Sequence, residues 1–414
     1  GSEFLGVDLA EDPIARGRGV IRALGLENIR LLTLDLMDFG PSFGAFDYII
    51  AHGLYAWVPE PVRDRILAIA KAHLAPHGVA FVSYNANPAG RLRQAMREMM
   101  LYHAGALDDP MERVARGLAF LEFVSVRRNE PDPYVDLLRK EVEELAKRRP
   151  PGIYHDELSD VYWPVYFHEF VDHAAGHGLQ YLSEAVFSDM QAGFLPAETQ
   201  QKLREISGGD VLRYEQYLDF MKFRKFRQTL LCHADVVLNR SPEPAWLRGL
   251  FVSSRANRAA PPAGSASGVE RFETSTGASV VTNHPLVKAV LGRLIGARPK
   301  SESFQDLLAL GEEPALAGVL LQLYGATLLG LHAHQPPLAS APGERPEASR
   351  LARFQARTRR LVTTLLHNSV TLEDELSCRL LQLLDGTRNR GALLDELSAH
   401  GFGIDREIFA GQLE

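Results

Sequence analysis

The stretch FDYIIAHGLYAWVP, residues 46–59, decides the fold that we expect for this chain. Its first half, Phe46 to Ala51, is a short apolar run with β-forming residues, bounded by Gly44 and Gly53. Such a run is typical of a strand that is buried on both faces inside a parallel sheet. Open α/β sheets bind ligands just beyond the carboxyl ends of their strands, so the polar and aromatic residues that follow predict a site.

The segments around this strand alternate between short apolar runs and amphipathic helices. We expect further strands at 4–9, 29–36 and 79–84, and helices at 12–24 and 61–74. This alternation, with short connections, predicts an α/β fold built on a doubly wound, Rossmann-like parallel sheet.

Later segments extend this core. The periodicity from 91 to 149 is helical with two breaks, and residues 197–231 are expected to be helical as well. Residues 165–187 predict a helix, a glycine turn and a strand, and residues 248–254 predict one more strand. We expect these two later segments to complete the sheet.

Composition shifts divide the chain into domains. Residues 257–268 and 335–349 are rich in Pro, Ala, Gly and Ser, which is typical of linkers. Two helices joined by a glycine turn over 372–397, followed by the Gly-containing residues 402–404, predict a winged-helix-like unit. The expected division is a partial Rossmann-like core at 1–90, a helical regulatory and dimerisation domain at 91–256, a C-terminal domain at 269–334 and the winged-helix-like unit at 350–414.

The composition excludes several classes of protein. The 414 residues suffice for two or three domains, and the net charge of −7 gives no general attraction to nucleic acid or anionic membranes. No signal peptide is visible, and the apolar stretch 316–331 is shorter than the roughly 20 residues that a membrane-spanning helix needs, which favours a buried core helix. The two cysteines form no disulfide framework, so we expect a cytoplasmic protein.

Two acidic residues, Asp8 and Asp35, stand at the ends of consecutive predicted strands. In a doubly wound nucleotide-binding sheet, an acid after the second strand accepts hydrogen bonds from ribose hydroxyls. An acid one strand further along accepts from an adenine amino group, while the backbone N–H of Leu36 meets a ring nitrogen. The alternative is that both carboxylates cap turns or helices, and the spacing alone leaves both interpretations open.

Several long motifs carry a resemblance to a known family, namely FLGVDLAEDPIARGR, LDLMDF, FDYIIAHGLYAWVP, LAPHGVAFVSYN and REMMLYHA. Together they resemble the class I S-adenosylmethionine (AdoMet)-dependent methyltransferases that carry a methyltransferase regulatory domain. PVYFHEFVDHAAGHGLQYLSEA and YEQYLDFMKFRKFRQTLLCH resemble the regulatory domain itself, and LLQLLDGTRNRGALLDEL resembles the C-terminal winged helix. This group includes bacterial protein-lysine methyltransferases, so the resemblance implies AdoMet as cofactor and a protein lysine as acceptor. We also expect a homodimer contact in the helical middle region.

The resemblance implies roles for single residues at three strand ends. The matching positions are Asp8 and Leu9 for the ribose, Asp35 and Leu36 for the adenine, and His52 and Gly53 for the methionine part and the acceptor. The family's glycine-rich loop belongs to a strand before FLGVDL, whereas this chain opens with a Gly-Ser-Glu-Phe sequence that resembles a cloning remnant. Loss of that strand would leave two unpaired sheet edges, so we expect a cropped sequence; the alternative is a chain that has lost cofactor binding.

Methyl transfer from a sulfonium depends on proximity, orientation and a desolvated acceptor rather than on a nucleophile–base pair. Aromatic faces around an incoming cationic amine would hold it by cation–π attraction. The predicted catalytic residues follow or end the strands nearest to the expected methyl position, and they are His52, Tyr55, Trp57 and Tyr84. For each of the aromatic residues the alternative is packing in the core.

The histidines between 168 and 177 raise the question of a metal site. His173 and His177 share a helix face, but His168 and His173 are five residues apart, which is about 140° around a helix. His155 is a possible further ligand, but no thiolate is near it. The spacing favours a helix face at a domain contact, and we predict no metal.

Basic residues alternate with aromatic ones at 213–227 and recur at 350–360. The aromatic steps of three and four are typical of a packing stripe, so we expect the basic residues to form its solvated side. Nucleic-acid binding is therefore not expected. The sequence predicts an AdoMet-dependent protein-lysine methyltransferase. It leaves open a catalytically inactive methyltransferase-like scaffold, a winged-helix DNA-binding regulator and, on the histidines, a metal hydrolase.

Overall fold

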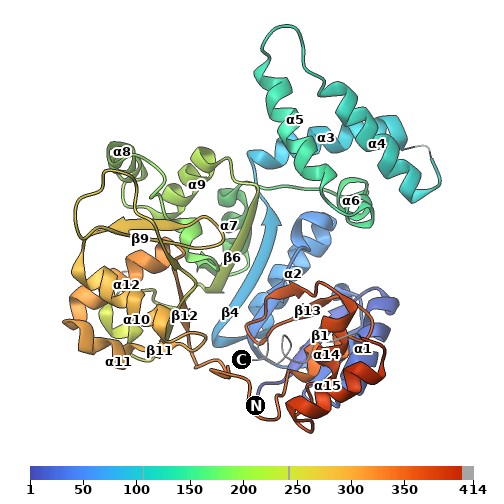
Figure 1. Cartoon of the computed structure of the whole chain (residues 1–414). Coiled ribbons are helices and arrows are strands. Elements are labelled where there is room, and N and C mark those ends of the chain that lie inside the picture. Colours follow the sequence, from blue (N-terminus) through green and yellow to red (C-terminus); the bar gives the residue numbers. More distant parts are fainter. Residues whose placement is uncertain (106, 241–242, 403–414) are drawn as a thin grey trace. The chain divides into compact units, whose positions relative to one another are not determined.

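The structure is a computed structural model that describes residues 1–105, 107–240 and 243–402 (Figure 1). The chain divides into two compact units. The central unit comprises residues 34–238, and the terminal unit comprises residues 1–33 together with the chain from 239 onward. The glycine-containing end expected for the winged-helix-like unit, at 403–404, lies outside the described residues.

A four-stranded sheet with the order β3-β4-β6-β5 is the centre of the central unit. Its strands are β3 (Phe46–Ala51), β4 (Leu74–Asn85), β5 (Leu179–Glu184) and β6 (Phe226–His233). β3 and β4 are parallel, whereas β6 is antiparallel to both of its neighbours. The expectation that residues 165–187 contribute a strand to this sheet is confirmed by β5.

The prediction of helical structure over residues 197–231 is wrong for the last part of this segment. Residues 197–222 form α8 (Ala197–Ser207) and α9 (Val211–Lys222), but β6 follows them. Arg227, Thr229 and Leu231 are fully buried at every second position, as expected for a strand between two neighbours. The basic and aromatic residues at the start of β6 concealed this alternation.

The expectation that β3 is buried on both faces is also wrong. Tyr48 and Ile50 are 74% and 72% exposed, whereas Ile49 packs against the core. α2 (Glu60–His73) covers only one face of the strand, and β4 is the strand's only sheet neighbour among the described residues. β3 is therefore an edge strand in this structure.

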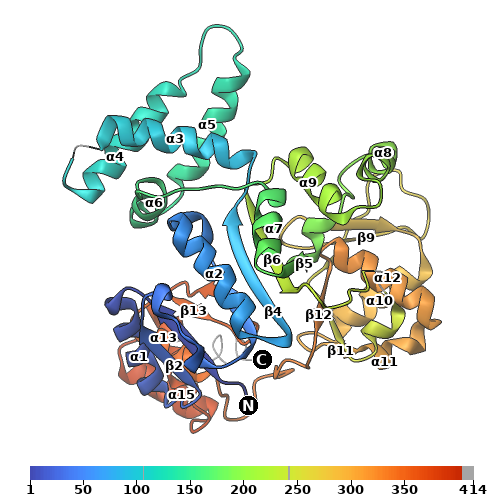
Figure 2. The ribbon, with the colours of Figure 1, turned by 180° about the vertical axis from the view of Figure 1, so that it is seen from behind.

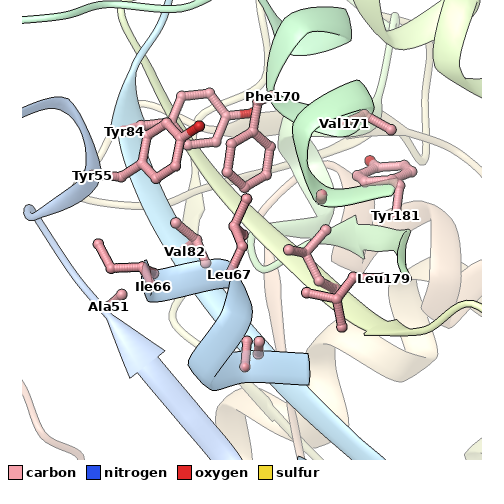
Figure 3. Packing of buried hydrophobic residues seen from close by; sticks show 14 of the residues in the cluster. Ala51, Tyr55, Ile66, Leu67, Val82, Tyr84, Phe170, Val171, Leu179 and Tyr181 are labelled. Atoms are coloured by element: carbon pink, nitrogen blue, oxygen red, sulfur yellow. The ribbon is translucent and has the colours of Figure 1, made fainter. Parts of the chain in front are cut away.

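Two helices, α2 and α7 (Phe167–Gly176), lie on the same face of this sheet. Leu67 of α2 and Phe170 of α7 are fully buried in one cluster with Val82 and Tyr84 of β4 (Figure 3). Burial of a side chain of this size contributes roughly 1.5–3 kcal/mol, so the cluster fixes both helices on the sheet.

A separate group of helices follows the carboxyl end of β4 (Figure 2). It consists of α3 (Ala89–Ala104), α4 (Pro110–Val124), α5 (Pro133–Ala146) and α6 (Pro150–Glu157). Met100, Leu121 and Leu138 are fully buried in its own small core. The helical region expected from residue 91 to 149 is confirmed, with its breaks near the two predicted prolines.

The first part of the terminal unit is a parallel strand pair with one helix. β1 (Phe4–Asp8) pairs with β2 (Ile29–Thr33), and α1 (Glu11–Leu24) connects them. Gly25 ends α1 with a φ of 59°, which is the left-handed conformation that glycine adopts at the least cost. The register pairs Asp8 with Thr33, two residues before Asp35.

The terminal unit contains two further small sheets with their own core. One has the order β11-β7-β12 and the other β10-β9-β8. The strands are β7 (Phe251–Ser254), β8 (Asn257–Ala259), β9 (Glu270–Glu273), β10 (Ser279–Thr282), β11 (Glu302–Ser303) and β12 (Leu329–His332), and the helices are α10 (Pro285–Gly296), α11 (Phe304–Leu307) and α12 (Glu313–Gly325). The expectation that residues 248–254 complete the central sheet is wrong, because β7 pairs with β11 and β12 instead.

The apolar stretch at 316–331 begins in α12, where Leu316 and Leu320 are fully buried, as expected of a core helix. Within the described residues, no helix has by itself both the length and the apolar composition of a membrane span; one sharply bent pair, Phe304–Leu310 with Glu313–Gly325, meets these two criteria only when taken together.

The last elements form a compact helical unit with a two-stranded wing. They are α13 (Arg350–Gln355), β13 (Leu361–Thr363), β14 (Ser369–Thr371), α14 (Glu375–Leu383) and α15 (Arg390–Ala399). β13 and β14 are antiparallel, and Leu383, Leu393 and Leu397 are buried between the last two helices. The helix, turn and helix predicted over 372–397 are confirmed.

Candidate functional site

The carboxyl ends of β3 and β4 are joined by one serine, Ser83. Its hydroxyl oxygen accepts a 2.7 Å hydrogen bond from the backbone N–H of Gly53 and lies 2.9 Å from Nδ1 of His52. Gly53 has a φ of 64°, a conformation that strains residues with a Cβ. His52 and Gly53 are therefore held together at the strand end where the sequence predicted a site. Ser83, which alternation along β4 hides in the interior, was missed.

Tyr55 and Tyr84 are brought together inside the central unit, with ring centroids 6.0 Å apart (Figure 3). Their exposed fractions are only 2% and 1%. The Tyr84 hydroxyl is 3.1 Å from Oγ1 of Thr229. Burial raises the pKa of Tyr55 to about 12 and that of Tyr84 well above its ordinary value, so both keep their protons at neutral pH. These surroundings favour core packing, and the catalytic role of both residues stays a prediction.

Trp57 is more accessible and has different neighbours. Its ring lies 5.0 Å from that of Tyr162, and the guanidinium of Arg93 lies 5.1 Å from its centroid. Trp57 thus contacts a residue just before α7 and a residue of α3, the first helix after β4. Its predicted catalytic role is not tested by these contacts.

The acids at the first two strand ends each cap a turn. Asp8 Oδ1 accepts from the N–H of Ala10 at 2.8 Å, and Asp35 Oδ1 accepts from the N–H of Met37 at 2.9 Å. Capping is one of the two interpretations that the spacing left open. In the described part of the chain, the Oδ2 atom of each carboxylate accepts no hydrogen bond, so it is free for a ligand. Asp8 belongs to the terminal unit and Asp35 to the central unit, so their predicted common rim stays a prediction.

The two leucines beside these acids differ in exposure. Leu9 is 72% exposed and Leu36 is partly buried against the core of the central unit. The backbone carbonyl of Leu36 accepts a 3.2 Å hydrogen bond from Nε of Arg65. The N–H of Leu36, which is proposed to meet an adenine nitrogen, therefore belongs to a turn that Arg65 holds by a hydrogen bond.

A pocket of about 250 Å³ opens beside the carboxyl end of β4. The helices of the 89–157 group form one wall, and the segment between α9 and β6 forms the other. Among its lining residues, Asn85 is only 6% exposed, yet its Oδ1 atom has no hydrogen-bond partner among the described residues. The Tyr162 hydroxyl is likewise buried without a partner in that part of the chain. Both side chains thus belong to the lining of the pocket and carry a buried polar atom with no partner in the described part of the chain.

Most of the charged residues that line this pocket are paired with one another. Arg93 binds Glu157 through two hydrogen bonds of 3.0 and 2.6 Å, and Lys225 contacts both carboxylate oxygens of Glu141 at 2.6 and 2.7 Å. Burial raises the pKa of Tyr162 to about 12, so its hydroxyl stays protonated. The lining is close to neutral in sum and offers unpaired neutral hydrogen-bonding groups.

The histidines of α7 and its C-terminus separate as the helical spacing predicts. The Nδ1 atom of His168 lies 2.8 Å from Gln216, away from the other two. His173 and His177 both point toward Asp64 of α2, which the sequence analysis did not consider. Hydrogen bonds from His177 and then His173 hold the pKa of Asp64 below its usual range. His155 bonds its sequence neighbour Asp156 instead.

The basic residues at 213–227 are not all solvated, so that expectation is wrong for Arg224 and Arg227. Arg227 is fully buried, with its guanidinium 3.9 Å from the ring centroid of Phe167. It donates to carboxylates of Glu184, Glu215 and Asp219 at 2.5 to 3.0 Å. Such pairing offsets the large desolvation cost of a buried charge.

Two family models match the chain. One is described as a predicted methyltransferase regulatory domain and matches residues 151–233. The other is described as the PKMT C-terminal winged helix domain and matches residues 344–401. Both matches fall on the motifs that carried the resemblance in the sequence.

Similar solved structures exist for most of the chain. Two structures of PKMT2 from Rickettsia typhi, one of them in complex with AdoHcy, have a TM-score of 0.84 to this chain. They are 27% and 26% identical to it, and the similarity covers 96% of this chain and 81% of theirs. The predicted α/β methyltransferase fold with a C-terminal winged helix is thereby confirmed.

Two relatives come from Rickettsia prowazekii (strain Madrid E). The uncharacterised protein RP789 is 39% identical over 241 residues, and the uncharacterised protein RP028 is 33% identical over 174 residues. The chain covers 43% of the first and 70% of the second. It thus spans less than half the length of RP789.

The fold defines a class I methyltransferase architecture. The chain belongs to the family of methyltransferases that carry a methyltransferase regulatory domain and a PKMT-type winged helix.

Proposed function

We propose that this protein is an AdoMet-dependent methyltransferase that methylates lysine side chains of a protein. The observation that carries the proposal is the similarity to PKMT2 over 96% of the chain, including the complex with AdoHcy, the demethylated form of AdoMet. Because PKMT stands for protein lysine methyltransferase, the acceptor class follows from the same similarity. The partner is therefore a protein substrate.

Each of the two units, taken by itself, has residues with groups that suit the cofactor. Asp35 has a carboxylate oxygen free for an adenine amino group, and Asp8 has one free for ribose hydroxyls. The left-handed turn at Gly53 keeps the end of β3 clear of side chains, because no atom lies within 4 Å of a Cβ built there. When bound, AdoMet supplies a methyl group on a sulfonium, which passes to an amine lone pair while the carbon–sulfur electron pair stays on sulfur.

The pocket beside β4 is the best-supported place for the acceptor side chain. Methyl transfer needs a neutral amine, because an ammonium has no lone pair. The lining of balanced charges gives little stabilisation to an extra ammonium, while Asn85 Oδ1 can accept an N–H from the neutral amine. Tyr162 lines the same pocket and packs against Trp57. In this proposal Asn85 and Tyr162 orient the amine.

The test uses the purified protein with AdoMet and a lysine-rich acceptor protein. Calorimetry should show AdoMet binding, and hydrolysis of the acceptor should release methylated lysine. The same acceptor with acetylated lysines is the control and should gain no methyl groups. Absence of AdoMet binding would favour the inactive scaffold, and methylation of the acetylated control would contradict lysine as the acceptor.

Two further expectations, on the oligomeric state and on the location in the cell, accompany this proposal. A homodimer contact through the helical middle region agrees with the exposed apolar side chains of Tyr102 and Phe123, which are 91% and 73% exposed on α3 and α4. A cytoplasmic location agrees with the low cysteine content, two residues in 414. Sedimentation of the purified protein measures the first, and cell fractionation measures the second.

A further inference from the structure

Three side chains that could bind a metal ion converge between α2 and α7. Asp64 Oδ1 is 2.8 Å from Nε2 of His177 and 3.4 Å from Nε2 of His173. The three ligand atoms all lie within 4.8 Å of one another. Asp64 is more than 100 residues from both histidines in the sequence, so only the packing of the two helices brings them together.

The site is built on rigid elements. Leu67 of α2 and Phe170 of α7 are fully buried in the same cluster, which fixes the two helices relative to one another. His173 and His177 are four residues apart and so project from one side of α7 and its C-terminus. Their side chains are 30% and 20% exposed and that of Asp64 is 59% exposed, so an ion can reach the cluster from solvent.

The ring nitrogen of His173 that faces away from Asp64 has its own hydrogen-bond partner. Nδ1 of His173 lies 2.7 Å from the Tyr55 hydroxyl. When the imidazole proton is on Nδ1, the Tyr55 oxygen accepts it and Nε2 keeps its lone pair for a metal. Tyr55 is 2% exposed and packs against Phe170, so it holds this ring in a fixed orientation.

We propose that Asp64, His173 and His177 form a binding site for a divalent transition metal ion, with Zn²⁺ as the reference ion. Two imidazole nitrogens and one carboxylate oxygen are a donor set that Zn²⁺ and its neighbours prefer, whereas Mg²⁺ and Ca²⁺ favour oxygen donors. Three protein ligands leave at least one coordination position for water or another ligand. The sequence argued against a metal because His168 is out of line, and Asp64 takes the place of that ligand.

The position of this site suggests what it does. His173 and His177 lie in the segment matched by the regulatory domain model, whereas Asp64 lies in α2. Tyr55 lies two residues after Gly53 and three after His52, the strand-end residues. A bound ion therefore ties the regulatory segment to the loop beside the proposed cofactor site. This inference stands apart from the proposed function, because metal binding is measurable without AdoMet or an acceptor.

The experiment measures zinc binding to the purified protein after removal of metals by a chelator. Titration calorimetry at neutral pH should show one Zn²⁺ per chain, and zinc should raise the melting temperature. Asp64→Asn and His177→Ala should each weaken binding by roughly 10-fold or more, and Tyr55→Phe should weaken it by roughly 10-fold. His168→Ala is the matched control, since this histidine of the same helix bonds Gln216 instead, and it should bind as the parent does.

Melting of each variant in the presence of chelator checks that it folds. Should His177→Ala fail to fold, Asp64→Asn decides the matter, because that side chain is exposed and the change is isosteric. The inference is overturned if the parent protein binds no zinc. It is equally overturned if Asp64→Asn binds zinc as tightly as His168→Ala does.

Discussion

Arg227 carries its charge in the interior of the central unit, and its hydrogen-bond partners determine how much of the desolvation cost is offset. Three carboxylates, those of Glu184, Glu215 and Asp219, accept its hydrogen bonds, while Arg224 also contacts Asp219. Two cations thus face three acids. Burial makes the largest contribution to the pKa of Glu215 and raises it from 4.5 to about 6. The two arginines do not cancel this rise, because they are shared among three acids.

The raised pKa of Glu215 predicts a pH-dependent stability. Between pH 4.5 and 6 the folded state holds a proton that the unfolded state has lost, so the free energy of unfolding falls as the pH rises through this window. Replacing Glu215 by Gln removes the effect. The difference in unfolding free energy, Glu215→Gln minus parent, should therefore rise on the order of 2 kcal/mol from pH 4.5 to 7.

Urea denaturation of both proteins across this pH range measures that difference. Ala197→Ser, a change at an exposed residue of α8 that removes no ionisable group, is the control and should give a difference that does not vary with pH. A difference for Glu215→Gln that is equally flat would show that this carboxyl does not titrate in the window.

Tyr162 offers a test of the acceptor pocket at the same scale. Tyr162→Phe removes the unpaired hydroxyl and keeps the ring that packs on Trp57. Loss of a hydrogen bond to the amine should cost about 1 kcal/mol, so kcat/KM for the acceptor should fall roughly 5- to 10-fold. The Kd for AdoMet should stay unchanged.

Tyr154→Phe, on α6 but outside the pocket lining, is the control, and an equal loss there would count against a role for Tyr162.

At the scale of elements, most of the fold was predictable and one strand was not. The strand over 46–51 is a short apolar run and the helix over 61–74 has clear helical periodicity, so their type and approximate position were confirmed. β6 was missed because its inward positions begin with Arg227, a residue that alternation alone assigns to solvent. Three acids from α9 and β5 pair with this residue in the interior, and they lie on other elements, 8, 12 and 43 residues before it in the sequence.

The start of α9 gives a prediction about this element. The Asp210 carboxylate accepts from the N–H groups of Leu212 and Arg213 at 2.8 and 3.3 Å, which is the bonding of a helix N-cap. Asp210→Ala should lower the free energy of unfolding by about 1 kcal/mol, because two N–H groups lose their acceptor. Asp210→Asn keeps an acceptor and should cost much less. Equal losses for both variants in urea denaturation would contradict capping.

At the scale of the whole molecule, local sequence patterns locate strand ends but not their partners. His52 and Gly53 were predicted because they follow an apolar strand. Asp64, Ser83 and Asn85 were not, because their roles arise from contacts with residues between 30 and more than 100 positions away or from an empty pocket. The separation of Asp8 and Asp35 into two units shows the same limit, since a common rim depends on how distant segments assemble.

The winged-helix-like unit gives the last prediction, which concerns DNA. A winged helix can enter the major groove, and α13 with the turn after it carries Arg350, Arg353 and Arg357. The side chains that follow are partly engaged, since Arg360 donates to the carbonyl of Glu373 at 3.1 Å. The net charge of −7 opposes approach to a phosphate backbone, and the family model that matches this unit is the PKMT C-terminal winged helix domain. A gel shift with mixed-sequence duplexes at physiological salt should therefore show no retained complex, and any binding at low salt should vanish as salt is added. A complex that survives physiological salt and distinguishes one duplex from another would instead assign this unit to DNA recognition.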